Sequence, residues 1–250
     1  EPTNPRSYHI MTIEILPRSF ATALKSVAYA MSTDTTKTWL NRILVECTGR
    51  ELVLVATDGH RLAKAAIPMA DEQDKWQATI PGANVSDLVK AVSAQAKGKG
   101  LLTVSKHRIE SPAGQFEFDT AEMFPPYAQV IPQQSEVSVE YAESVELTTV
   151  TGALKTANKR QNGTVHSVGN ELRFSADVNA CTAIRANVGC GQINGTIKLT
   201  GFCLAYLHDA AKSLKGFAAR LQWSGELDPL VIKSRVDTID LTAVVMPVRI

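Results

Sequence analysis

The chain has 250 residues, of which 44% are hydrophobic and 20% are charged, a composition that excludes a disordered or fibrous protein. Its 26 Lys+Arg and 25 Asp+Glu leave a net charge of +1, which excludes a long basic arm or an acidic tail but allows an uneven distribution of charge. No apolar run approaches the ~20 residues of a membrane helix, and the N-terminus lacks a signal peptide, so we expect a soluble, cytoplasmic protein without membrane contact.

The first half of the chain predicts a simple order of elements after a flexible leader at 1–10. Alternating apolar residues indicate a strand, and Pro17 begins a helix that runs to Met31. A turn that contains Gly49 joins two alternating segments into a β-hairpin. The predicted elements are the strand 12–16, the helix 17–31, the hairpin strands 42–47 and 51–56, the helix 84–97 and a strand meander over 101–118.

The second half of the chain repeats this order. Glu51 and Ala56 lie 120 positions before Glu171 and Ala176, and the second helix of each half recurs at an offset of 119. We therefore predict an α+β fold of two domains, 11–134 and 135–250, each with two helices packed on one face of mostly antiparallel strands. The elements of this half are the strand 137–141, the helix 144–160, the hairpin strands 165–168 and 171–176, the helix 202–215 and a meander over 221–245.

A proline-rich stretch separates the two repeats. Pro125, Pro126 and Pro132 lie within it, and proline both removes a backbone donor and disfavours a helical residue before it. The stretch therefore rules out a helix and marks the linker, with the domain boundary near Gln134.

The predicted helices concentrate positive charge. Taken as 17–32, 84–99, 144–160 and 202–215, they contain ten basic and three acidic residues, a net charge of +7. Helices that share one face of a sheet would present this charge to a polyanion such as nucleic acid. The alternative is that lysines near helix C-termini only complement the helix dipole.

The segment 57–62 is the one that most invites a catalytic interpretation, because Asp58 beside His60 could form a base with its orienting group. Asp-Gly between two strands is first a turn signature, however, and the chain contains no nucleophile motif and no cofactor motif. The histidines lack metal-ligand spacing, and the four cysteines, Cys47, Cys181, Cys190 and Cys203, are too scattered for disulfides or zinc. We expect free, mostly buried thiols and a non-enzymatic protein without a metal or cofactor.

The C-terminal segment 241–250 is unusually apolar for a chain terminus and has to be covered. One interpretation is a last strand buried in the second domain's sheet, with Pro247 at its end. The other is that Val244, Met246 and Pro247 leave the sheet and line an apolar groove near the linker, with Met as an adaptable wall.

Three segments carry a resemblance to a known family. The stretch Ala56-Thr-Asp-Gly-His-Arg-Leu-Ala63, the linker with Phe124-Pro125, Tyr127 and Val130-Ile-Pro132, and the terminus Val244-Val-Met-Pro-Val-Arg-Ile250 resemble signature segments of the bacterial DNA polymerase III beta subunit, the sliding clamp. The resemblance covers about 12–250 and matches the second and third of that family's three domains. It implies a DNA clamp fold, in which six similar domains form a ring with helices lining a hole for duplex DNA. The implied function is a non-enzymatic processivity factor in DNA replication that slides on DNA.

The resemblance also implies a hydrophobic pocket between the two domains, in which DNA polymerase and repair partners insert a peptide with Leu and Phe anchors. A groove of Leu, Val, Pro and Met suits such anchors. The residues carried over to this pocket are Lys37, Leu40, Thr57, Gly59, His60, Arg61, Leu62, Pro125, Val130, Tyr206, Val244, Met246 and Pro247.

The loop 33–39 matches a family segment that lies near the duplex, and Lys37 and Trp39 keep its polar and aromatic character whereas Asp34 does not. Contact with double-stranded DNA would be through phosphates and independent of base sequence. Arg42 and Cys203 depart from the family pattern, which points to a different partner preference. With the helical cations, the expected DNA-facing residues are Arg18, Lys25, Lys37, Trp39, Lys90, Lys97, Lys155, Lys159, Arg160, Lys212 and Lys215.

The family's first domain has no counterpart in this sequence. Two such domains cannot close a ring of six as a dimer, whereas three copies of two domains can, so we favour a homotrimer among the homo-oligomers. One alternative is a monomeric clamp-like adaptor that binds clamp-partner peptides without encircling DNA. Another is an excised fragment of a longer clamp. A clamp loader is a possible further partner.

Overall fold

A computed structural model describes residues 12–98, 100–111, 114–121, 124–133, 135–140, 145–157, 162–169, 171–179, 182–189, 192–196, 198–214 and 218–249. The leader expected at 1–10 and the boundary residue Gln134 lie outside these residues, as do Cys181 and Cys190. Of the other two cysteines, both free, Cys47 is buried and Cys203 is half-buried. No helix in the described ranges is long and apolar enough to cross a membrane.

The first repeat contains the predicted elements at nearly the predicted places. Pro17 occupies the first turn of helix α1, which buries Phe20, Leu24 and Val27 at the spacing of one helical face. The elements are β1 (Thr12–Ile15), α1 (Pro17–Ala28), β2 (Arg42–Cys47), β3 (Glu51–Thr57), β4 (Arg61–Pro68), β5 (Trp76–Pro81), α2 (Gly82–Gln95), β6 (Leu102–Ser105), β7 (Arg108–Ser111) and β8 (Gly114–Glu117).

The second repeat follows the same order with two additional short strands, β13 and β18, and the α+β fold is confirmed. Its helix α4 is shorter than predicted because the residues before Leu204 extend a strand instead. The elements are β9 (Val137–Glu140), α3 (Val145–Ala157), β10 (Asn162–Val168), β11 (Glu171–Asn179), β12 (Thr182–Gly189), β13 (Gln192–Asn194), β14 (Thr200–Cys203), α4 (Leu204–Ser213), β15 (Ala219–Trp223), β16 (Leu230–Val236), β17 (Ile239–Val245) and β18 (Pro247–Val248).

The strands form three antiparallel sheets rather than one set per domain. The orders are β1-β6-β7-β8, β12-β11-β10-β14-β18 and, for the largest, β13-β9-β15-β16-β17-β4-β3-β2-β5. Helix α2 contacts both β8 of the four-stranded sheet and β5 of the nine-stranded one, and α4 contacts both β14 and β17. The predicted packing of two helices on antiparallel strands in each repeat is confirmed, and the structure adds that each repeat divides its strands between two sheets that its helices contact.

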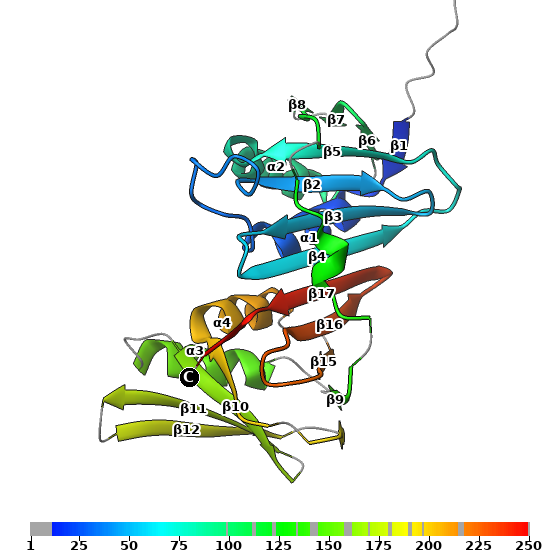
Figure 1. Cartoon of the computed structure of the whole chain (residues 1–250). Coiled ribbons are helices and arrows are strands. Elements are labelled where there is room, and N and C mark those ends of the chain that lie inside the picture. Colours follow the sequence, from blue (N-terminus) through cyan, green and yellow to red (C-terminus); the bar gives the residue numbers. More distant parts are fainter. Residues whose placement is uncertain are drawn as a thin grey trace, which may run out of the picture.

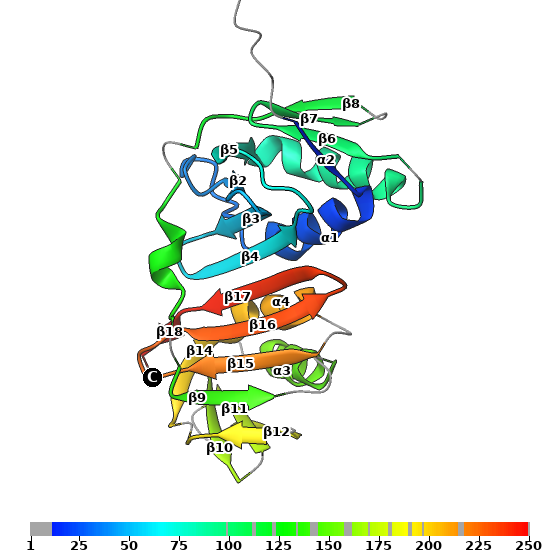
Figure 2. The same cartoon turned by 90° about the vertical axis from the view of Figure 1, so that its right-hand side faces the viewer.

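The nine-stranded sheet crosses from one repeat to the other at β4 and β17. Six residue pairs join these strands, from Arg61↔Val245 to Ala66↔Asp240. Figure 2 shows the four helices of the described chain on one side of this sheet, with α1 next to α4 where the repeats meet. The cores of the two repeats are one continuous cluster, which contains Phe20 of α1 as well as Phe174 of β11.

The linker crosses the opposite face of the same sheet (Figure 2). Contrary to the prediction, it contains one helical turn, the 3-10 helix η1 (Tyr127–Val130). A single 3-10 turn tolerates Pro126 just before it, because the missing N–H would have no partner at that position. Phe124, Tyr127 and Ile131 of the linker pack on an apolar cluster that contains Leu62 and Val244 from the two sides of the β4–β17 joint.

The C-terminal segment combines both interpretations. Val244 does not leave the sheet, as the second interpretation required: it lies in β17 and is 1% exposed. Met246 follows the strand, is half-buried, and donates its backbone N–H to the carbonyl of His60 at 2.9 Å. Pro247 then begins β18, which pairs with β14.

The shared sheet predicts that the two repeats unfold together. We expect Phe20→Ala, in the first repeat, to cost about 3–5 kcal/mol, because it leaves a large cavity in the common core. Variants that retain either Trp76 or Trp223 as the buried fluorophore should report the same, shifted urea midpoint in both repeats. Two separate midpoints would contradict a joint that couples the repeats.

Candidate protein-binding pocket and helical face

An apolar pocket lies where the linker crosses the joint between the repeats. Its volume is about 110 Å³. Leu62 of β4 and Val244 of β17 are directly opposite each other in the ladder and form its floor. The other lining residues are Leu40, Thr57, Gly59, Arg61, Pro125, Tyr127, Val130 and Met246.

The turn between β3 and β4 forms one wall of the pocket through its own hydrogen bonds. Thr57 Oγ1 donates to the carbonyl of Arg61 at 2.7 Å and accepts from the N–H of Gly59 at 3.1 Å. The Asp58 carboxylate accepts the backbone N–H groups of His60 and Arg61 at 2.9 and 3.1 Å. Gly59 has a φ of +92°, a conformation that side chains disfavour, so the Asp-Gly turn expected from the sequence is also the one this geometry needs.

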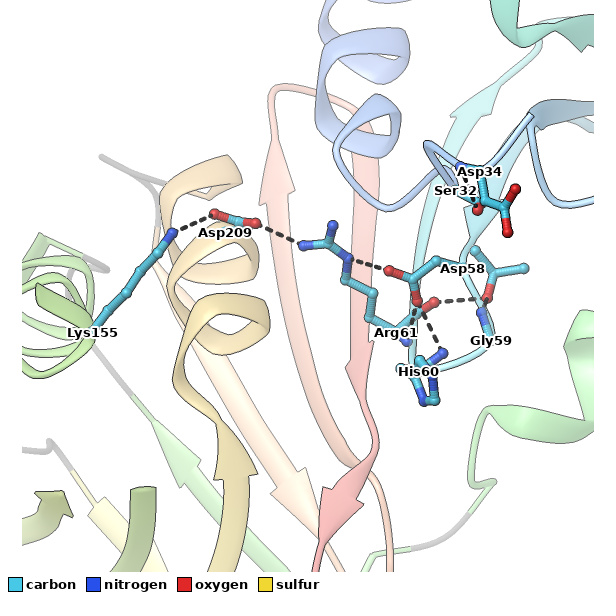
Figure 3. Close-up of polar contacts among 9 residues, drawn as sticks. Ser32, Asp34, Asp58, Gly59, His60, Arg61, Lys155 and Asp209 are labelled. Atoms are coloured by element: carbon cyan, nitrogen blue, oxygen red, sulfur yellow. Dashed lines mark hydrogen bonds and ion pairs between the residues drawn. The ribbon is translucent and has the colours of Figure 1, made fainter. Parts of the chain in front are cut away.

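Arg61 connects this turn to the second repeat (Figure 3). Its Nε donates to Asp58 Oδ2 at 2.9 Å, and its Nη1 donates to Asp209 Oδ2 of α4 at 2.7 Å. Asp209 also lies 3.6 Å from Lys155 Nζ of α3. The side chains of Arg61 and Asp58 are only 13% and 14% exposed, so these charges interact with little screening by water.

Two tyrosines enclose the guanidinium group. It lies 4.6 Å from the ring centre of Tyr206 and 5.5 Å from that of Tyr29, distances typical of cation–π contacts. Burial lowers the pKa of Arg61, but the hydrogen bond to Asp209 and the charges of Asp58 and Asp209 outweigh burial and raise that pKa above its usual value. Arg61 is thus a permanently charged bridge between the repeats.

The same contacts argue against the catalytic interpretation of Asp58 and His60. The Asp58 carboxylate is occupied by Arg61 and by two backbone donors, the N–H groups of His60 and Arg61. The His60 ring instead stacks on Tyr206, with ring centres 6.1 Å apart and an interplanar angle of 13°. Asp58 therefore positions a turn and does not orient a histidine base.

Nine of the thirteen residues assigned to the pocket from the resemblance line it. They are Leu40, Thr57, Gly59, Arg61, Leu62, Pro125, Val130, Val244 and Met246. Lys37 lies in an exposed loop 3.9 Å from Asp34, while His60 and Tyr206 stack beside the pocket and Pro247 begins β18.

Tyr127 lines the pocket although the sequence assigned it no place there. Its hydroxyl donates to the Glu46 carboxylate of β2, which fixes the linker on the sheet. Burial and this acceptor raise the pKa of Tyr127 above its usual value. The sequence signal that could have placed Tyr127 in the pocket is its position as an aromatic residue among the prolines of the linker.

Half of the ten helical cations expected from the sequence lie within the observed helices. Within their observed bounds the helices contain five basic and three acidic residues, a net charge of +2 for this described part. Lys97 follows the end of α2, and Lys99, Lys159, Arg160 and Lys215 lie outside the described residues.

Several of the expected DNA-facing cations also have carboxylate partners. Lys90 lies 2.9 Å from Asp87, and Arg18 lies 3.4 Å from Asp237 on the hairpin of the second repeat. Lys155 pairs with Asp209 as described above. Trp39 is 40% exposed on the loop that also holds Lys37.

Lys25 and Lys212, which lie where the repeats meet, differ from these paired cations. They lie on α1 and α4, are exposed, and have no carboxylate partner among the described residues. Together with Tyr29 and Asp209 they line a hollow of about 440 Å³ on the helical side of the sheet. Two exposed lysines from different repeats therefore line one hollow at the joint.

The Arg61 bridge makes a prediction about stability. Replacing Arg61 by Gln leaves Asp58 without its cation and Asp209 with Lys155 alone, in a half-buried site, so we expect a loss of about 2–3 kcal/mol in the free energy of unfolding. The matched control is Arg235→Gln, which breaks an exposed Arg–Asp pair and should cost less than about 1 kcal/mol. Equal losses in urea unfolding would contradict the bridge.

Comparisons with known proteins agree with this architecture. Residues 14–123 match the family model of the DNA polymerase III beta subunit, central domain. The beta sliding clamp of Synechocystis sp. is 26% identical over 246 residues, which cover 91% of this chain and 62% of that clamp. The beta sliding clamp of Pseudomonas aeruginosa is 26% identical over 230 residues, which cover 89% of this chain and 61% of that clamp.

Solved structures show the same fold. A crystal structure of the DNA polymerase III subunit beta from Pseudomonas aeruginosa has a TM-score of 0.84 at 21% identity and covers 100% of this chain and 69% of that one. The beta subunit from Thermotoga maritima has a TM-score of 0.84 at 18% identity, with 100% and 68% covered. This chain spans about 62% of the curated relative's length. The chain is similar to beta sliding clamps over about nine tenths of its length, and residues 14–123 match that family's central domain.

Proposed function

We propose that this protein is a DNA sliding clamp: a non-catalytic ring around duplex DNA that holds a polymerase and repair proteins to their template in the cytoplasm. The observation that carries the proposal is the arrangement of the two repeats. All described helices lie on one face of a continuous sheet, and the linker, which contributes Pro125, Tyr127 and Val130 to the pocket, crosses the other face. A surface for DNA and a surface for a protein partner are thus separated by one layer of strands.

The first experiment asks whether binding is topological. A ring should stay on nicked circular DNA during gel filtration in ~0.5 M salt, where phosphate contacts alone are largely screened. Linearising the DNA should release it, because a ring can slide off the ends. Equal retention on both forms would contradict a clamp.

The pocket suits a peptide better than a small metabolite. Its volume of about 110 Å³ is well below the ~300–1,000 Å³ typical of small-molecule sites. It can accept one or two apolar side chains, and the partner's remaining contacts would lie outside it. Met246 adds a side chain that adapts to different anchors.

We predict that Met246→Ala with Val130→Ala weakens binding of a Leu/Phe-containing clamp-binding peptide by at least about tenfold, since two walls of a desolvated pocket are lost. Both residues are partly exposed, so the fold should tolerate the change. Leu227→Ala, on an exposed Leu outside the pocket, is the control. Fluorescence anisotropy with the labelled peptide is the measurement, and unchanged affinity would remove the pocket from the proposal.

Lys25 and Lys212 should contact DNA phosphates. We expect reversal of both to Glu to weaken DNA affinity at low salt, and the slope of log affinity against log salt concentration to become shallower by about two. Lys233→Glu is the matched control, because Lys233 is exposed on β16 at the opposite face of the sheet. A loss of affinity that does not change with salt would argue against phosphate contact.

A homotrimer is the assembly that supplies six clamp-type repeats from chains of two. The alternative, a monomeric adaptor, is favoured by the carboxylate partners of Arg18, Lys90 and Lys155, which leave these cations less available to DNA phosphates. Light scattering at micromolar concentration separates the two: three chain masses support the ring, and one chain mass with intact peptide binding supports the adaptor.

A further inference from the structure

A groove larger than the pocket lies on the linker side of the sheet, and the function proposed above gives it no role. It is formed between the linker and strands β2 and β5, and its volume is about 920 Å³. Leu44, Phe124 and Tyr127 contribute apolar surface to it. Figure 1 shows the linker crossing the strands of the first repeat on its way to the joint. The linker therefore shapes two concave surfaces, the pocket and this groove.

The groove adjoins the pocket, because Pro125 and Tyr127 line both. Along the β2–β3 ladder, Thr57 of the pocket lies four residues beyond Val53, which is opposite Glu46 of the groove. Four strand residues span about 13 Å, and an extended peptide covers that distance with about four residues of its own. A peptide whose apolar anchors occupy the pocket can thus reach the groove within a few residues.

Two lysines from different sheets line the groove. Lys75 directly precedes β5 of the nine-stranded sheet, and Lys106 lies in the turn between β6 and β7 of the four-stranded sheet. Both are exposed, and neither has a carboxylate partner among the residues that the structure describes. Ser105 Oγ accepts the N–H groups of His107 and Arg108 at 3.3 and 3.2 Å, which holds the turn that presents Lys106.

Glu46 is the only carboxylate among the described residues that line the groove, and its oxygens already have partners. Its Oε1 accepts a hydrogen bond from Gln77 Nε2 at 2.6 Å, and its Oε2 accepts one from the Tyr127 hydroxyl. Asp74, next to Lys75 in the sequence, does not line the groove. The charge that the groove offers to a ligand is therefore positive.

We propose that this groove binds acidic residues that flank the apolar anchors of the partner peptide, with Lys75 and Lys106 contacting their carboxylates. The inference rests on the proposed function, in which the pocket holds the anchors, and it names where the partner's remaining contacts lie. Because both lysines are exposed, these ion pairs add more to the choice of partner than to affinity. A peptide with an acidic flank is selected over one with a neutral or basic flank.

Extended peptides test this selection. A Leu/Phe peptide with a spacer of about four Gly/Ser residues and then an Asp/Glu flank should bind about three- to tenfold more tightly at low salt than the same peptide with an Asn/Gln flank. Salt at ~0.5 M should remove the difference, because exposed ion pairs are screened. One peptide carries the flank before the anchors and another carries it after them. The absence of a gain in both would overturn the inference.

Charge reversal assigns the effect to the groove. Lys75→Glu with Lys106→Glu should abolish the preference for the acidic flank and create a preference for a Lys flank, while the affinity for the unextended peptide stays unchanged. Lys233→Glu is the matched control, since Lys233 is exposed on the same face of the sheet in the second repeat and does not line the groove. A reversed protein that still prefers the acidic flank would rule out the groove as the site.

Two further measurements separate this inference from the proposed function. The acidic flank without the anchors should not bind measurably, and binding as tight as that of the extended peptide would make the groove an independent anion site and overturn its link to the pocket. Binding of the unextended peptide without a gain from the acidic flank overturns the inference and leaves the proposed function in place. Failure of every anchored peptide to bind overturns the proposed pocket itself.

Discussion

The backbone ladder between β4 and β17 is the interaction on which the rest of the molecule depends. It turns two sequence repeats into one nine-stranded sheet and gives them a common core. Because a one-residue slip in a ladder moves every side chain to the other face, this register determines what each face of the joint presents. With the observed register, Leu62 and Val244 face the linker side together.

The pocket and the Arg61 bridge are both consequences of that register. Met246 follows β17 directly, so its backbone can bond to His60 in the turn before β4. Arg61 is the first residue of β4 and lies opposite Val245, which directs its side chain toward α4. The Arg61 bridge, which includes Asp209 of the second repeat, thus holds in place the turn that forms one wall of the pocket.

The charged residues on the helical side of the sheet are also arranged around the joint. Asp209 lies at the joint between Arg61 and Lys155 and neutralises charge there, while Lys25 and Lys212, which line the same hollow, have no carboxylate partner within the described ranges. A net charge of only +1 for the whole chain is compatible with a local concentration of positive charge.

Local sequence patterns were enough to predict the order of the elements, the repeat and the Asp-Gly turn, because hydrophobic period, proline position and turn chemistry act over a few residues. Three signature segments also identified most of the pocket. The positions of Val244 in a strand and of Tyr127 in the pocket, and the pairing of particular lysines with carboxylates, became known from the folded structure. These depend on contacts between distant residues, such as Arg61 and Asp209 at a separation of 148 positions, and no local pattern encodes the packing that brings them together.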